Sequence, residues 1–337
     1  MAKFNYGGQA VVEGVMMRGQ HSAAVAIRRY SGDILLHEER LNPRLYANRW
    51  LRLPFLRGLL LLWDMLVLGT RMLMYATSAS LPPETSDTGR GEQPLAGKNA
   101  SAFGSPSALA GQAMSSAVHE SQPGDVQSIG GPGLVITMLL SLTFVVALFF
   151  LAPLAVTGAA QRWIGQGWLS LLTEGIIRLV LLLGYLWLIG RMPGVRRVFE
   201  YHGAEHKAIN TFETGLPLDV AHVRQASRVH TRCGTGFLLI VMVISIVVFA
   251  LVGNPPLPLR VLSRVALVPV VAAIAYELMR LGAANYRYRV VRWLLAPGLA
   301  LQGLTTREPD DGQMECAIAA LTRVLERDGV PALQRVV

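Results

Sequence analysis

The residues best suited to chemistry are His202-Gly203-Ala204-Glu205-His206, an H-x-x-E-H arrangement. Histidines four residues apart lie on one face of a helix, about one turn from each other, as two ligands of one metal ion require. Glu205 lies beside that face, where its carboxylate could take a proton from water activated by the metal. Zinc lowers the pKa of bound water to about 7. The pattern predicts a divalent metal, most consistent with zinc, and a general base at Glu205; the simpler alternative is a pair of histidines hydrogen-bonded within a polar bundle.

A third ligand is needed, and the sequence offers several candidates. His230 and Cys233 are three residues apart, a spacing that suits two ligands on one turn, and imidazole and thiolate both suit zinc. Glu277 is a further candidate, because the topology predicted below places it in the cytoplasmic half of the last membrane span. Simpler alternatives remain open: Cys233 as a small buried residue, and Glu277 as the ion-pair partner of Arg280. His222 is a weaker option.

The composition is that of a membrane protein. Of 337 residues, 52% are apolar and 16% are charged, which argues against a purely soluble enzyme. The formal net charge is +9, but the basic residues are not interleaved with aromatic ones, so nucleic-acid binding is not expected. Cytoplasmic loops enriched in Lys and Arg explain this charge more simply. Two cysteines are too few for a disulfide framework, which favours a reducing compartment for the polar parts.

Four segments are long and apolar enough to cross about 30 Å of hydrocarbon. They are residues 133–156, 168–190, 235–252 and 265–284. A fifth apolar stretch, Leu53–Ala76, is interrupted by Arg57, Asp64 and Arg71, which lie seven residues apart on one helical stripe. This stretch is expected to lie at the interface or to line a bundle rather than to cross alone, because a fifth crossing would export one of the basic segments 1–52 and 191–234. The sequence therefore predicts four spans in a bacterial inner membrane, with both termini cytoplasmic.

The remaining segments are predicted to be soluble. Tyr30-Ser31-Gly32-Asp33 separates residues 23–29 from 34–39, which is typical of a β-hairpin. Pro193 and Gly215 bracket a helix around the two histidines, and Asp310 or Asp311 can cap a C-terminal helix. The predicted fold is mainly α: a four-helix transmembrane bundle with a small N-terminal β-hairpin region and cytoplasmic helices. The sequence predicts four units. Residues 1–80 hold the hairpin and the amphipathic or interfacial helix, and residues 81–131 form a disordered linker. Residues 132–284 hold the four spans and the metal-binding loop 191–234, and residues 285–337 hold the C-terminal helix.

Four sequence blocks resemble one bacterial family. GGQAVVEGVMMRG, FEYHGAEHKAIN, SRVHTRCGT and LTTREPDDGQMECAIAAL are similar to the YqhQ family, a domain of unknown function described as predicted metal-dependent membrane proteins. The likeness covers roughly residues 5–80 and 130–327, which makes residues 81–129 an insertion. It implies a polytopic membrane protein with a metal. His202, Glu205 and His206 also match the inverzincin peptidase motif, whose enzymes are large soluble proteins.

Two functions from different classes remain after this reading of the sequence. The first is a metal-dependent hydrolase, of which a peptidase is one form, that acts at the cytoplasmic membrane face on an unidentified protein or peptide partner. His202 and His206 would hold zinc, Glu205 would activate water, and His230 or Cys233 would complete the site. The second is a non-catalytic scaffold or transport component with a structural metal. An open coordination position would distinguish the hydrolase, because structural zinc sites are closed by four protein ligands.

Overall fold

The N-terminal residues form a sheet that is larger than the predicted hairpin. The computed structural model describes residues 6–41, 53–80, 118–120, 136–165 apart from 137, 138, 142 and 146, 167–253 and 255–330. The strands are β1 Gly7–Val11, β2 Gly14–Arg18, β3 Ser22–Arg28, β4 Ile34–Arg40 and β5 Val118–Glu120. β1 to β4 form an antiparallel meander, and β5 runs parallel to β4. The predicted hairpin is confirmed as β3–β4, and the glycine-rich segment before it adds β1 and β2. Apart from β5, the predicted linker lies outside the described residues.

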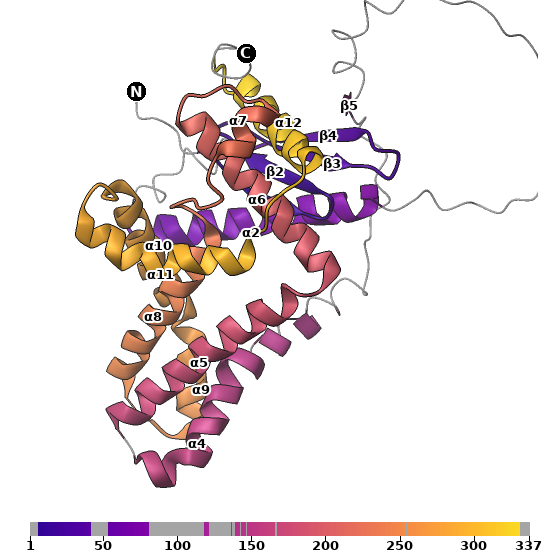
Figure 1. Cartoon of the computed structure of the whole chain (residues 1–337). Helices are drawn as coiled ribbons and strands as arrows, with labels where there is room; N and C mark the ends of the chain where they lie inside the picture. Colours follow the sequence, from indigo (N-terminus) through magenta and orange to yellow (C-terminus); the bar gives the residue numbers. More distant parts are fainter. Residues whose placement is uncertain are drawn as a thin grey trace, which may run out of the picture.

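Helices cover both faces of this sheet (Figure 1). One face packs against α6 Pro193–Glu213, α7 Val220–Gln225 and α12 Asp311–Arg327. The other face packs against α2 Leu56–Ser80. Neighbouring residues of a strand point to opposite faces, so both faces of β2 and β3 are apolar and buried. The cap predicted for the C-terminal helix is present, because Asp310 and Gln313 form a capping box.

The charged stripe of α2 binds other elements. Asp64 lies 3.5 Å from Arg18 of β2, and Arg71 lies 2.8 Å from Glu39 of β4. Arg57 reaches α10 Val268–Ala284. Together with the buried apolar side chains of its second half, these ion pairs fix α2 along the sheet.

Helices that are long and apolar enough to cross a membrane form the other half of the protein. The part of the chain that the structure describes contains five such stretches, judged by length and composition: Leu56–Ser80, Leu139–Ala160, Trp168–Ile189, Gly234–Val252 and Pro258–Ala284. Three of them are single helices: α2, α5 Trp168–Ile189 and α8 Gly234–Val252. The second stretch contains the π-helix η2 Ala147–Leu151 and most of α4 Ala152–Ile164, and the last contains most of α9 Leu257–Ala266 and all of α10. The four predicted spans overlap the last four of these stretches, and α2 is the segment expected at the interface. The sequence did not predict α11 Arg289–Thr305, which lies beside α8.

A buried group of charges joins three of these helices. Glu174 and Arg178 of α5 form the predicted ion pair at 2.8 Å, and Arg264 of α9 lies 3.3 Å from the same carboxylate. All three side chains are buried, and Arg178 also donates to Ser245 of α8. One carboxylate therefore serves two guanidinium groups in an apolar surrounding.

Removing this carboxylate should destabilise the helical half strongly. Glu174→Ala leaves two buried arginines without their anion, and we expect it to lower the free energy of unfolding by about 3–5 kcal/mol. The matched control is Glu315→Ala, which removes a half-exposed partner of Arg28 and should cost at most about 1 kcal/mol. Reversible unfolding in detergent micelles would measure both values. Equal losses for the two variants would show that the buried group does not hold the helices together.

Candidate metal centre

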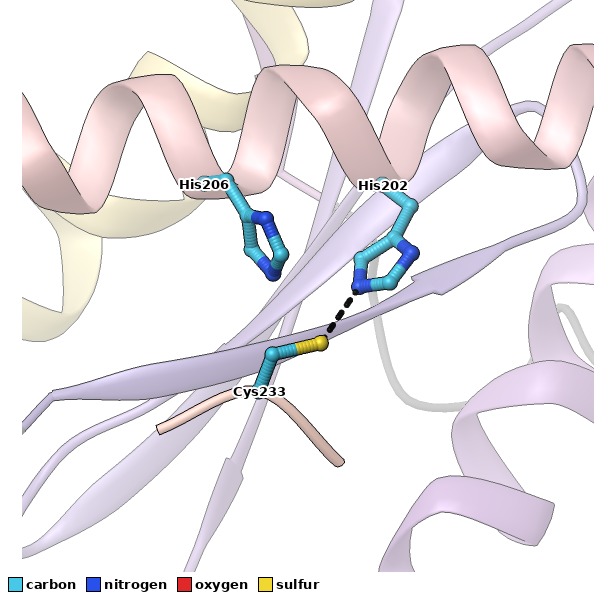
Figure 2. A group of neighbouring side chains, drawn as sticks. All are labelled: His202, His206 and Cys233. Atoms are coloured by element: carbon cyan, nitrogen blue, oxygen red, sulfur yellow. Dashed lines mark hydrogen bonds between the residues drawn. The ribbon is translucent and has the colours of Figure 1, made fainter. Parts of the chain in front are cut away.

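Helix α6 carries both histidines of the predicted motif. It begins at Pro193, whose fixed φ suits the first turn of a helix, and it buries Tyr201, Ala204 and Ala208 against the sheet. Because these residues define one face, His202 and His206 lie on the next face. Both rings point to the same side of the helix, toward Cys233 (Figure 2). Their ring centroids are 4.4 Å apart. The helix therefore presents two neighbouring imidazoles, as the spacing predicted.

Backbone carbonyls fix the orientation of each imidazole. The Nδ1 atom of His202 lies 2.9 Å from the carbonyl oxygen of Thr305, and that of His206 lies 2.5 Å from the carbonyl oxygen of Arg228. A carbonyl oxygen only accepts, so each Nδ1 carries the proton and donates it. In the neutral ring the Nε2 atom is then left with its lone pair free. Metal-binding histidines are oriented by this kind of hydrogen bond in other proteins.

Cys233 brings a sulfur atom to the same place. It is the N-cap residue of α8, and its Sγ atom accepts from the backbone N–H of Thr235. The Sγ atom lies 3.3 Å from Nε2 of His202 (Figure 2). One ligand atom each from His202, His206 and Cys233 lies within 4.8 Å of the others. Three potential ligands thus meet from two elements that are far apart in the sequence.

The fit of this group to a metal can be judged from its unsatisfied atoms. Nε2 of His206 is buried and has no hydrogen-bond partner among the described residues. Such an atom costs free energy unless something binds it. Two imidazole nitrogens and one thiolate are a donor set that suits zinc. The residues present therefore fit a metal, although they do not identify the ion.

Glu205 lies beside the three ligands. Its side chain is buried, and its Oε2 atom is 3.9 Å from Nε2 of His202. On the other side it meets β1: a Cβ atom at Gly8 would lie 3.0 Å from Cγ of Glu205. The carboxylate is therefore near the ligand atoms without being one of the three. This is the position that a general base requires.

The other two predicted ligands have different surroundings. His230 is buried next to the group, with its ring centroid 5.6 Å from that of His206, but its Nε2 atom faces Glu213 at 3.7 Å. Burial lowers the pKa of His230, which favours its neutral form. Glu277 is not brought to the group: its carboxylate accepts from Arg57 of α2, not from Arg280. Its physical role is to hold α2 against α10.

Comparison with known proteins assigns the chain to a family. Residues 53–327 match the model of a family described as "Protein of unknown function (DUF1385)". The chain belongs to the DUF1385 family. It is 34% identical to "Uncharacterized protein YqhQ" of Bacillus subtilis strain 168, over 96% of this chain and 93% of that protein. The resemblance seen in the sequence is thereby confirmed. No solved structure matches the chain.

A cavity of about 550 Å³ opens beside the three ligands of this DUF1385 chain. His202, His206, Cys233 and Glu205 line one side of it. Strand β1, Arg18, Arg232 and apolar side chains of α2, α6, α8 and α10 are among the residues that line the rest. The candidate metal centre is therefore accessible from a cavity large enough for a segment of another molecule.

Several residues that shape the site were missed by the sequence analysis. Gln302 of α11 holds the His230 backbone with two hydrogen bonds, through His230 N–H at 2.9 Å and through its carbonyl at 2.8 Å. Thr305 of the same helix supplies the carbonyl that orients His202. Glu213 of α6 binds Arg232 and faces His230. Thr305 lies in the LTTRE block that carries the family resemblance, whereas Gln302 lies outside it and has no signal in the sequence.

Proposed function

We propose that this DUF1385 protein is a zinc-dependent hydrolase at the cytoplasmic face of a bacterial inner membrane. His202, His206 and Cys233 hold the metal, and Glu205 is the general base. The observation that carries the proposal is the convergence of two oriented imidazoles and a thiol. The Nε2 atom of one imidazole is buried and has no partner in the described part of the chain. Three protein ligands leave the fourth position of a tetrahedral ion open, as in catalytic zinc sites.

Each residue has a separate task in this proposal. Bound zinc supplies a Lewis acid that makes water more acidic and polarises a carbonyl group. Glu205 accepts the proton of the attacking water, and its buried carboxylate faces the cavity beside the three ligands, where that water would bind. The carbonyls of Thr305 and Arg228 keep the imidazoles in the tautomer that binds metal.

The packing of α2 supports a location at the membrane face. Its second half buries Leu68, Met72 and Tyr75 against the soluble sheet, so it cannot lie across the bilayer along this length while the sheet stays in water. We therefore keep four spans, with α2 at the interface and the basic segment 191–234 in the cytoplasm. This arrangement places the cavity where the sheet meets the apolar helices.

Cobalt substitution tests whether the proposed site is open. The protein, stripped with a chelator and loaded with Co²⁺ in detergent, should show a thiolate charge-transfer band, and acetohydroxamate should change the visible spectrum by taking the open position. A Cys233→Ser variant, the matched control, should lose the charge-transfer band. A spectrum that does not respond to acetohydroxamate would indicate a closed site and would overturn the hydrolase proposal.

One observation favours a structural metal as the second candidate. His230 lies next to His206, so a rotation of its side chain could supply a fourth protein ligand and close the site. The protein would then be a scaffold or transport component stabilised by its metal. Glu213 opposes this rotation, because the Nε2 atom of His230 lies 3.7 Å from its carboxylate and would have to leave it. The cobalt spectrum distinguishes the two candidates.

A further inference from the structure

We propose that the substrate is an extended peptide segment with apolar side chains, which adds as a strand to the free edge of β1. This inference rests on the proposed function, since it places the peptide against the proposed metal. Recognition by strand addition uses the main-chain hydrogen bonds of an exposed sheet edge for affinity, and side-chain pockets for specificity. Three features of the chain support it: an open edge, a cavity around that edge, and walls that suit apolar side chains.

Strand β1 is the edge of the sheet. The strand order is β1-β2-β3-β4-β5, and among the described strands β1 pairs with β2 alone. Pairing with β2 begins at Val11 and Gly14, which flank a two-residue turn. In such a hairpin the pair at the turn is hydrogen-bonded and the next pair is not, so Gly8 and Ala10 direct their N–H and C=O groups to the free side. An unpaired row of this kind is a template for another strand.

The cavity beside the metal ligands encloses this edge. Residues 7–10 line it, together with His202, Glu205 and His206 on the α6 side. On the opposite side of the strand, the cavity is lined by α2. The side chain of Gln9 lies against Gly69 of α2, where a Cβ atom would come within 2.2 Å of Oε1 of Gln9. A peptide paired with β1 would therefore run directly past the ligands.

The two glycines of β1 leave room for this approach. A Cβ atom at Gly8 would lie 2.4 Å from the carbonyl oxygen of Met16 and 3.0 Å from Glu205, so only glycine lets the strand come this close to the general base. A Cβ atom at Gly7 would meet nothing within 4 Å, which means that no packing requirement explains the glycine there. The absence of side chains at both positions leaves the main chain accessible.

The walls of the cavity indicate the side chains of the substrate. Leu61, Leu62 and Met65 of α2 line it, with Phe237 of α8 and Met279 of α10. All three helices belong to stretches that are long and apolar enough to cross a membrane. An apolar segment at the membrane face would find matching surfaces there. A fatty acyl chain would fill the same walls but could not use the polar edge of β1, and for this reason we infer a peptide.

Hydrolysis of a peptide bond at this position needs one water molecule and no other reactant. Water attacks the carbonyl carbon of the peptide bond, and its oxygen atom becomes part of the new carboxyl group. Glu205 takes one proton of the water and passes it to the leaving nitrogen as the C–N bond breaks. One water is consumed, and a carboxylic acid and an amine are formed.

Hydroxamate probes test the strand addition on the zinc-loaded full-length protein in detergent. The probes are acetohydroxamate, dodecanoyl hydroxamate and tri-leucine hydroxamate, which share the metal-binding group. We expect tri-leucine hydroxamate to bind at least about tenfold more tightly than the other two probes. Methylation of its backbone amides should weaken binding at alternate positions only, by about tenfold where the lost N–H pairs with β1. Equal affinity of dodecanoyl hydroxamate would favour a lipid and overturn the inference. The same holds if every N-methylated peptide binds like its parent.

The Ala10→Pro variant tests the same inference from the protein side. Proline removes one outward N–H at an edge strand, a position where proline is tolerated. Affinity for tri-leucine hydroxamate should fall by about tenfold, while acetohydroxamate should bind as before because the metal is intact. An unchanged affinity for the peptide probe would contradict strand addition. Should the variant fail to fold, the N-methylated series on the unmodified chain still decides.

Failure of the proposed function would give a different result. In that case the zinc-loaded protein would bind no hydroxamate at all. Failure of strand addition alone would leave all three hydroxamates binding, with no higher affinity for the peptide probe.

Discussion

His206→Ala protein should retain no zinc after purification, whereas the unmodified chain should carry one equivalent. His206 supplies one of three proposed ligands, and its Nε2 atom is buried without another partner. Even the loss of a residue that merely orients a ligand weakens metal affinity by 10–100-fold, roughly, so the loss of a ligand should cost more than about 100-fold. Metal content by elemental analysis, and affinity by competition with a chromogenic chelator, measure this effect.

The matched control for this variant is His222→Ala. His222 lies in the same predicted loop but bonds Asp219 on the surface. Its replacement should leave the zinc content at one equivalent. Zinc retained by His206→Ala at the level of the control would place the metal elsewhere. A fall in protein yield without a change in zinc per chain would indicate a packing role for His206.

Glu205→Gln should keep the zinc and lose the hydrolysis. Glutamine has the same shape and can still form hydrogen bonds, but it does not accept the proton of the attacking water. General-base catalysis contributes about 10²–10⁴-fold to a rate, and we expect kcat to fall by this factor. Turnover of a labelled library of apolar peptides, together with metal content, measures both quantities on one sample.

Glu200→Gln is the control for Glu205→Gln. Glu200 is also on α6, but its carboxylate faces Arg196 and Gln313, away from the three ligands. Its variant should keep most of the activity. If Glu205→Gln turned over substrate as fast as the unmodified protein, with full zinc occupancy, the hydrolase proposal would fall and the structural role of the metal would stand.

Local patterns predicted much of the fold, because they depend on periodicity and end signals. The apolar lengths located α5 and α8 within one residue, and the proline and glycine around the H-x-x-E-H segment located α6. The seven-residue spacing of Arg57, Asp64 and Arg71 predicted that they share one helical stripe. In the structure each of them forms an ion pair with another element. The strands β1 and β2 escaped prediction because glycines and a mixed pattern obscure their alternation.

The candidate site could be predicted only in part, because its members meet through the tertiary fold. The helical spacing of His202 and His206 was enough to pair them. Cys233 reaches them only because the segment after α7 turns back along α6, and no local pattern predicts such a return. Glu277 was assigned from its predicted depth in a span, but depth does not specify direction, and Arg57 of α2 binds it on another side.

Zinc K-edge X-ray absorption of the purified full-length protein tests the central claim most directly. The account predicts one sulfur ligand at about 2.3 Å, two imidazole nitrogens at about 2.0–2.1 Å, and one further light-atom ligand that is not imidazole. Loss of the sulfur shell in Cys233→Ser would assign it to that residue. Three results would contradict an open site formed by His202, His206 and Cys233. They are a spectrum without sulfur, a spectrum with three imidazoles and a sulfur, and a protein without stoichiometric metal.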